Sequence, residues 1–319
     1  MRKLLFLVLL VWGAVQAQTL TLYTSEVLQN INPMIELFQQ ANPGVKVQVF
    51  RSGTGEIIAK LRAELEAGNP QPDLLWIADE TFFRELSSKN LLRSVPVTNP
   101  GFPVKLAYQG GRYYEVRLLY NAIAINTRTL GGKPEPKTWS DLLKPDYKGL
   151  IGMPNPNFSG AALSTVGTFV QRLGLGFFEQ LKANGLKVEQ SNPVLQQKLA
   201  SGEYGLAIIT DFGIRDEIRK GAPLKVIYPR DGAILVPTPI GILSSSKQPK
   251  LAERFEQFLL SSEAQALFSQ QGYVPVIGSA PRPNGLSGEV LSIPSAGDYI
   301  QANRQSLLER FNALFGLKQ

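Results

Sequence analysis

The chain of 319 residues contains no histidine and no cysteine. It therefore cannot hold a Ser-His-Asp or Cys-His nucleophile pair, a zinc finger, an iron–sulfur cluster or a disulfide. Charged residues make up only 18% of the chain, and the formal net charge is +7. Residues 1–17 contribute +2 of this charge through Arg2 and Lys3, which leaves +5 without a long basic run. This balance disfavours a nucleic-acid partner and favours an anionic ligand or surface.

The amino terminus has the layout of a secretory signal peptide. Arg2 and Lys3 precede an apolar stretch from Leu4 to Val15, and Ala17 provides a small residue for cleavage. The apolar stretch is shorter than the roughly 20 residues that a membrane-spanning helix needs. We therefore predict that residues 1–17 are removed and that the mature protein is exported to the periplasm. In the absence of cysteine, we expect no amino-terminal lipid anchor.

Beyond residue 17 the sequence alternates between the period of a strand and the period of a helix. Its length and its 44% content of hydrophobic residues predict about two domains. The first stretch is predicted to form strand, helix, strand, helix and strand over residues 19–24, 28–38, 45–49, 57–65 and 73–77. Such alternation indicates an α/β fold with a mostly parallel sheet, whose ligands bind at the carboxyl ends of the strands.

Two extended segments are predicted to cross between lobes. Residues 113–126 form a run longer than the roughly 5 to 6 residues of an ordinary strand. Residues 234–243, which are interrupted by two prolines, would return the chain to its first lobe. Two crossings predict two lobes with a cleft between them. Lobe 1 would contain residues 18–112 and 238–283, and lobe 2 would contain residues 113–237 and 284–319.

Three strings resemble one family, and their order extends over nearly the whole mature chain. They are KTWSDLLKPDYKGLIGMPNP at 137–156, LASGEYGLAI at 199–208 and PKLAERFEQFLLSSEAQALFSQQGYVPV at 249–276. They are similar to the extracellular solute-binding proteins of ABC importers, in the group that includes ferric-iron, hexose-phosphate and phosphonate binders. The resemblance implies a two-lobe type II periplasmic-binding-protein fold that closes on its ligand by a hinge. It also implies delivery to a membrane permease rather than catalysis.

A Gly-rich turn, Ser52-Gly53-Thr54-Gly55, lies between a predicted strand and a predicted helix. Free backbone N–H groups, two hydroxyls and glycines that permit close approach make such a turn a candidate anion cradle. A helix N-terminus favours negative charge by about 0.3 to 1 kcal/mol when exposed. The alternative is that the turn is an ordinary helix cap. Glu56 also fits this alternative, because an acidic side chain in the first helical turn interacts favourably with the helix dipole.

A second turn of this kind lies in the other predicted lobe, where Ser159, Gly160 and Ala161 begin a helix. Taken alone, Ser159 is also explained as an ordinary cap. The resemblance favours a binding role, because iron-binding relatives hold an anion with a Ser-Gly-Ala helix start. They use in addition an Asn ahead of a Gly-Glu turn, and Asn192 matches that position. The anion half of the relatives' site is therefore expected here.

The metal half of that site is not expected. Iron binders of this group place two adjacent tyrosines after the strand that follows the Gly-Glu turn, and those positions are Phe212 and Gly213 here. Neither residue can coordinate a metal. Glu56 matches an acidic position that iron relatives can use, and Asp211 or tyrosines elsewhere would have to complete the set. Ferric iron therefore stays the alternative ligand, and no cofactor is expected.

Other candidate ligand-binding residues lie at the ends of strands. Arg117, on a crossing segment, is the preferred cation for an oxyanion, although it could equally be a solvated hinge residue. Asp211 follows a buried strand, where it would bind a ligand hydroxyl or ammonium or would cap the next helix. Ser25 and Glu26 at the end of the first strand, and Asp79 at the end of the third, are expected to border the ligand.

Together these observations predict a periplasmic solute-binding protein that captures a small phosphorylated or phosphonate anion. Its second partner would be an inner-membrane ABC permease, and it would act as a monomer. The alternative from another class is a secreted hydrolase with a pair of carboxylates, which needs neither His nor Cys. Only scattered acids such as Glu80 and Asp231 support that alternative.

Overall fold

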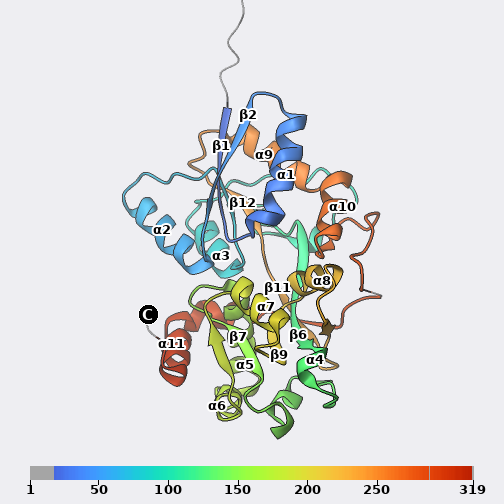
Figure 1. Ribbon diagram of the computed structural model, residues 1–319. Helices are drawn as coiled ribbons and strands as arrows, with labels where there is room; N and C mark the ends of the chain where they lie inside the picture. The colour runs from blue at the N-terminus through green and yellow to red at the C-terminus, as the bar shows by residue number, and fades with distance from the viewer. Residues whose placement is uncertain (1–17, 287, 318–319) are drawn as a thin grey trace, which may run out of the picture.

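The protein consists of two α/β lobes that lie one above the other in Figure 1. The computed structural model describes residues 18–286 and 288–317, so the predicted signal peptide lies outside the described residues. Each lobe is built around its own sheet. The prediction of an α/β fold with two lobes is confirmed. Within the described ranges, we find no helix with the length and apolar character that crossing a membrane requires.

The first lobe contains a six-stranded sheet in the order β2-β1-β3-β12-β5-β4. Strand β1 pairs in parallel with both β2 and β3, as the sequence pattern predicted. Its strands are β1 (Gln18–Thr24), β2 (Val45–Arg51), β3 (Leu74–Trp76), β4 (Ala107–Tyr108), β5 (Tyr113–Tyr114) and β12 (Ile240–Ile242). The lobe's helices are α1 (Leu28–Ala41), α2 (Thr54–Glu66), α3 (Glu80–Ser88), η1 (Val104–Leu106), α9 (Pro249–Leu259) and α10 (Ser262–Gln270).

Helices cover both faces of this sheet. Ile31, Met34, Ile35 and Phe38 recur at helical spacing on α1 and are buried in one hydrophobic core with residues of α9 and α10. Residues of α2 and α3 form a second core on the opposite face. Because neighbouring residues of a strand face opposite sides, Leu22 of β1 belongs to the first core and Tyr23 to the second. The carboxyl ends of the parallel strands β1, β2 and β3 are not covered by these helices and face the other lobe (Figure 1).

The second lobe contains an eight-stranded sheet with the path β14-β11-β6-β9-β7-β8, and β10 and β13 pair with β6. Its strands are β6 (Arg117–Asn126), β7 (Ile151–Pro154), β8 (Lys187–Glu189), β9 (Leu206–Thr210), β10 (Leu224–Ile227), β11 (Ala233–Val236), β13 (Val274–Pro275) and β14 (Ser292–Pro294). Its helices are α4 (Thr127–Leu130), η2 (Ser140–Leu143), η3 (Pro145–Tyr147), α5 (Gly160–Leu173), α6 (Gly176–Ala183), α7 (Asn192–Ser201), α8 (Asp211–Arg219) and α11 (Gly297–Phe315).

The chain crosses between the sheets close to the predicted positions. The extended run at 113–126 is divided, since β5 pairs within the first sheet and β6 within the second. A second crossing joins β11 to β12 through residues 237–239. The terminal helix α11 packs on α5 and also reaches α3 of the first lobe, where Arg304 Nη1 lies 2.5 Å from Asp79 Oδ2. The residue-level lobe boundaries given above stay predictions.

Candidate functional site

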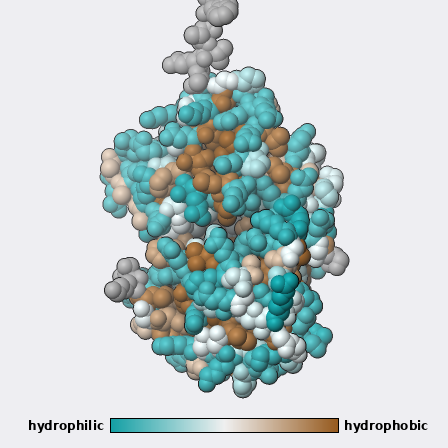
Figure 2. Space-filling view, in the orientation of Figure 1, coloured by the Kyte–Doolittle hydropathy of each residue, from teal (hydrophilic) through white to brown (hydrophobic). Residues whose placement is uncertain are grey.

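A cavity of ≈ 370 Å³ lies between the two lobes, at the carboxyl ends of β1, β2 and β9. Figure 2 shows the waist between the lobes, with hydrophilic side chains on both sides of it. Both candidate turns contribute to the cavity wall. Eight of the predicted ligand-binding residues line it: Ser25, Ser52, Gly53, Thr54, Ser159, Gly160, Ala161 and Asn192. The volume is in the range of cavities that hold small molecules.

The turn of the first lobe already holds a carboxylate of its own chain. Helix α2 begins at Thr54, and the side chain of Glu56 folds back over the N-terminus of this helix. Glu56 accepts hydrogen bonds from the Ser52 hydroxyl and, at 3.3 Å, from the backbone N–H of Gly53. The carboxylate thus already uses two donors of this turn that an external anion would need, and a third, Thr54 N, donates to Phe158 O. The sequence analysis considered an ordinary helix cap that includes Glu56 as the alternative to an anion cradle at this turn. The structure contains that cap.

The turn of the second lobe is open to a ligand. Ser159 caps helix α5, and its Oγ accepts from Ala162 N at 3.2 Å and from Asn192 Nδ2 at 2.8 Å. With both acceptor positions used, the hydroxyl hydrogen of Ser159 remains available to a ligand. The N–H groups of Gly160 and Ala161 precede the first hydrogen bond within α5, from Leu163 N to Ser159 O, and so have no acceptor in the helix. This end of α5 therefore offers several donors to an anion.

Arg51 lines the cavity, and the sequence analysis did not select it. It ends β2 directly before the Gly-rich turn, is exposed, and donates from Nε to the Glu26 carbonyl oxygen at 3.3 Å. The sequence could have indicated this role, because Arg51 lies at the carboxyl end of a predicted strand, where ligands of α/β sheets bind. Two further residues of the wall are Glu26, which is buried, and Phe212, which stacks on Tyr273 with ring centroids 4.2 Å apart.

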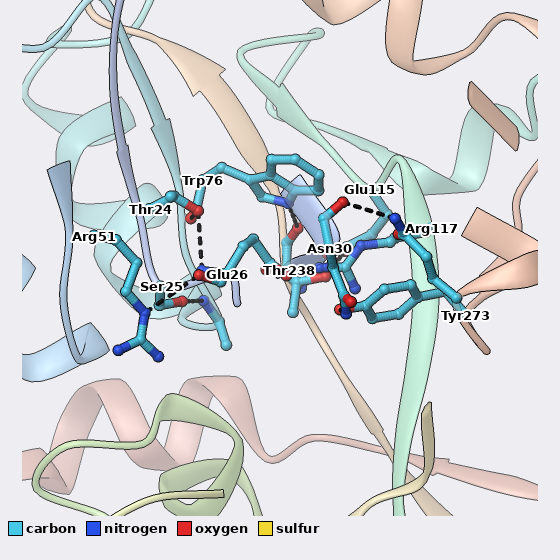
Figure 3. A network of polar contacts seen from close by, with 12 residues as sticks. Thr24, Ser25, Glu26, Asn30, Arg51, Trp76, Glu115, Arg117, Thr238 and Tyr273 are labelled. Carbon is cyan, nitrogen blue, oxygen red and sulfur yellow. Dashed lines mark hydrogen bonds and ion pairs between the residues drawn. The ribbon is translucent and has the colours of Figure 1, made fainter. Parts of the chain in front are cut away.

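Arg117 does not line the cavity, contrary to expectation. It is 1% exposed and pairs with Glu26, while its guanidinium lies 3.6 Å from the ring centroid of Tyr273. Figure 3 shows Glu26 between Arg51 on one side and Arg117 with Tyr273 on the other. Burial among aromatic rings, and not solvation at a hinge, accounts for the position of Arg117. Among the described residues that line the cavity, Arg51 provides the positive charge.

Asp79 and Asp211 also lie outside the cavity wall. Asp79 caps α3 by accepting from Phe82 N at 3.2 Å, and its other oxygen pairs with Arg304. Asp211 is buried against Arg215, whose Nη1 lies 2.8 Å away, and it also accepts from Tyr228 at 2.9 Å. Each carboxylate is therefore satisfied by its own structural partners.

The described part of the cavity wall differs from the tyrosine-containing iron site that the family resemblance suggested as an alternative. Within the described ranges, no tyrosine lines the cavity, and no group of three or more acidic residues is arranged to hold a metal. Burial raises the pKa of Tyr108 and Tyr228 above its ordinary value, so these phenols are poor sources of phenolate. Of the two acids considered for iron, Glu56 caps α2 and Asp211 is paired with Arg215.

The two lobes touch through their backbones at the edge of the cavity. Thr54 N, in the first lobe, donates to Phe158 O of the second at 2.9 Å. A Cβ atom added to Gly53 would lie 2.9 Å from Phe158 O, and one added to Gly160 would overlap Ala78 O of the first lobe. Glycine at these positions therefore permits this close contact between the lobes.

Comparison with known proteins assigns the class. Residues 20–274 match the family of bacterial extracellular solute-binding proteins, and the chain belongs to this family. The family resemblance predicted from three sequence strings is confirmed.

The names of similar proteins refer to different solutes. It is 22% identical over 254 residues to a putative 2-aminoethylphosphonate-binding periplasmic protein of Salmonella typhimurium, covering 76% of this chain and 72% of that protein. The periplasmic binding protein AfuA from Actinobacillus pleuropneumoniae, with fructose-6-phosphate bound, has a TM-score of 0.82 at 24% identity over 94% of this chain and 99% of its own. Iron-bound HitA from Pseudomonas aeruginosa has a TM-score of 0.79 at 24% identity, over 92% and 99%. The shared fold is the two-lobe type II periplasmic-binding-protein fold.

Proposed function

We propose that this solute-binding protein captures a small phosphorylated or phosphonate solute in the periplasm. It then delivers the solute to an ABC permease of the inner membrane, without chemical turnover. The family supports the transport role, and two of the similar proteins carry phosphonate or sugar phosphate in their names. The finer assignment of the ligand depends on the cavity itself.

The observation that carries this proposal is the open N-terminus of α5. There the Ser159 hydroxyl, with both acceptor positions filled, and the N–H groups of Gly160 and Ala161 stand at the same cavity as Arg51. Hydroxyl and backbone donors, a helix N-terminus and a guanidinium are the groups that bind phosphoryl oxygens. Thr54 and Ser25 add hydroxyl groups from the first lobe. Ferric iron is disfavoured, because within the described part of the chain no tyrosine lines the cavity, and its two carboxylates are already engaged, Glu26 by Arg117 and Glu56 by Ser52.

A thermal-shift screen of residues 18–319 tests this proposal. Phosphate esters and phosphonates should raise the melting temperature, because a ligand present at 100 times its Kd stabilises the folded state by about 2.7 kcal/mol. Sulfate and acetate serve as anion controls and should have smaller effects. If no phosphate ester or phosphonate shifts the transition, the assignment of the ligand class is wrong. Phosphorus NMR of the mixture should show the compound unchanged, since binding without turnover is expected.

A further inference from the structure

Glu26 presents a negatively charged carboxylate to a cavity whose helix N-terminus and Arg51 favour an anionic ligand. The residue follows β1 directly in the loop before α1, and only 7% of it is exposed. One carboxylate oxygen, Oε2, accepts from Arg117 Nη2. The printed contact with Arg117 uses this oxygen alone. Because Glu26 lines the cavity, its carboxylate can also accept a hydrogen bond from a donor on a ligand.

Arg117 holds this carboxylate in place. Its guanidinium lies 5.1 Å from the ring of Trp76, 5.6 Å from that of Phe268 and 3.6 Å from that of Tyr273. The aromatic cage prevents Arg117 from reaching a ligand directly, and it fixes the guanidinium against Glu26 (Figure 3). Burial raises the pKa of Glu26, and the charge of Arg117 opposes that rise. Arg117 is thus a positioning residue that favours the ionised carboxylate.

The second lobe supplies another acceptor at the same cavity. Asn192 donates from Nδ2 to Ser159, while its Oδ1 is buried and has no hydrogen-bond partner within the described residues. A ligand that carried only an anionic group would satisfy the donors of α5 but would offer no hydrogen-bond donor to Glu26 or to Asn192 Oδ1. The wall therefore fits a molecule with an anion at one end and a hydrogen-bond donor elsewhere.

We propose that Glu26, oriented by Arg117, binds a hydrogen-bond donor, either an ammonium or a hydroxyl group, on the organic part of the ligand. The inference rests on the proposed function and narrows it to ligands with two functional groups. Since the N-terminus of α2 is occupied by Glu56, the phosphoryl group binds at α5, and the organic part faces Glu26 in the first lobe.

Calorimetric titration with three matched probes tests this inference. The probes are 2-aminoethylphosphonate, 2-hydroxyethylphosphonate and ethylphosphonate, which share one carbon skeleton and differ in the donor. We expect at least one donor-bearing probe to bind about tenfold or more tightly than ethylphosphonate. Preference for the amino probe alone identifies an ammonium, and preference for both donor-bearing probes shows that a hydroxyl suffices.

Variants assign the preference to Glu26. In Glu26→Gln the advantage of the amino probe over ethylphosphonate should fall below about threefold. This variant leaves Arg117 unpaired in the interior, so the double variant Glu26→Gln with Arg117→Met, which removes both buried charges, provides a second background that should fold. Glu36→Gln, which removes an exposed carboxylate from α1, is the matched control and should keep the parent's preference.

The outcomes separate this inference from the proposed function. If the parent binds all three probes equally, the function stands and the role of Glu26 is wrong. If the preference for the amino probe over ethylphosphonate survives undiminished in both folded Glu26 variants, the role of Glu26 is likewise wrong. If none of the probes binds the parent while other phosphorylated compounds do, the function stands and this donor-bearing phosphonate class is excluded. If no phosphorylated compound binds at all, the proposed function itself fails.

Discussion

The variant Gly160→Ala should lower ligand affinity by roughly 10- to 100-fold while leaving the unliganded protein as stable as the parent. An added Cβ would overlap the carbonyl oxygen of Ala78 in the first lobe, so the lobes could not reach the closed arrangement. Forcing extra atoms into a packed contact costs about 1 to 3 kcal/mol, and here that cost falls on the closed state. Within the open state, alanine is a better helix residue than glycine at the start of α5. Calorimetry with the best ligand of the screen measures the affinity.

Small-angle scattering gives the second measurement for this variant. The parent should become more compact when ligand is added, whereas Gly160→Ala should keep a larger radius of gyration at saturation. Gly278→Ala is the control, because a Cβ at that exposed glycine meets nothing within 4 Å. Parent-like affinity and compaction in Gly160→Ala would show that the lobes do not close on a ligand through this contact.

The variant Ser159→Ala should weaken binding of the phosphorylated ligand by about 1.5 to 3 kcal/mol, the contribution of a hydrogen bond to a charged group. The expected loss follows from the free hydroxyl hydrogen that Ser159 directs to the ligand once its oxygen has accepted from Ala162 and Asn192. Ser52→Ala should have a much smaller effect, because the Ser52 hydroxyl donates to Glu56 instead. Calorimetric titration of the three proteins compares these affinities.

Loss of a helix cap has to be separated from loss of a ligand contact. Removal of an N-cap hydroxyl costs about 1 kcal/mol of stability, so Ser159→Ala should also melt slightly earlier than the parent. Ser261 caps α10 in the same way, accepting from Ala264 N at 3.2 Å, and it does not line the cavity. Ser261→Ala should therefore lose similar stability and keep the parent's affinity. Equal affinities in both serine variants would remove Ser159 from the binding site.

Much of the fold was predictable because long amphipathic elements carry their own pattern. The pattern of Ile31, Ile35 and Phe38 predicted α1, and the apolar run after Ser159 predicted α5. The short helix α6 was not predicted, since its eight residues follow α5 almost directly and lack a capping side chain. A crossing between lobes at residues 113–126 was predicted, but the point at which the run changes sheets was not. It depends on pairing of Tyr114 with Ile240, which lies far away in the sequence.

The site was predictable where local sequence defines it. In both lobes a strand is followed by a turn with serine and glycine and then by a helix. This pattern predicted that both turns lie at the cavity, because strand ends and helix starts share one edge of an α/β sheet. The burial of Arg117 away from the cavity could not be predicted locally, since the aromatic cage around it includes Tyr273, more than 150 residues away. The pairing of Asp211 had a local signal, because Arg215 lies four residues later on the same helix.

Equilibrium dialysis against ferric citrate and, separately, against the best phosphorylated ligand of the screen tests the central claim most directly. We predict that residues 18–319 retain one equivalent of the phosphorylated ligand. In ferric citrate they should stay colourless and retain no iron by metal analysis, because no tyrosine lines the cavity within the described residues. One equivalent of tightly held iron with visible absorbance, and no retention of any phosphorylated ligand, would contradict the account of the cavity while leaving the family assignment in place.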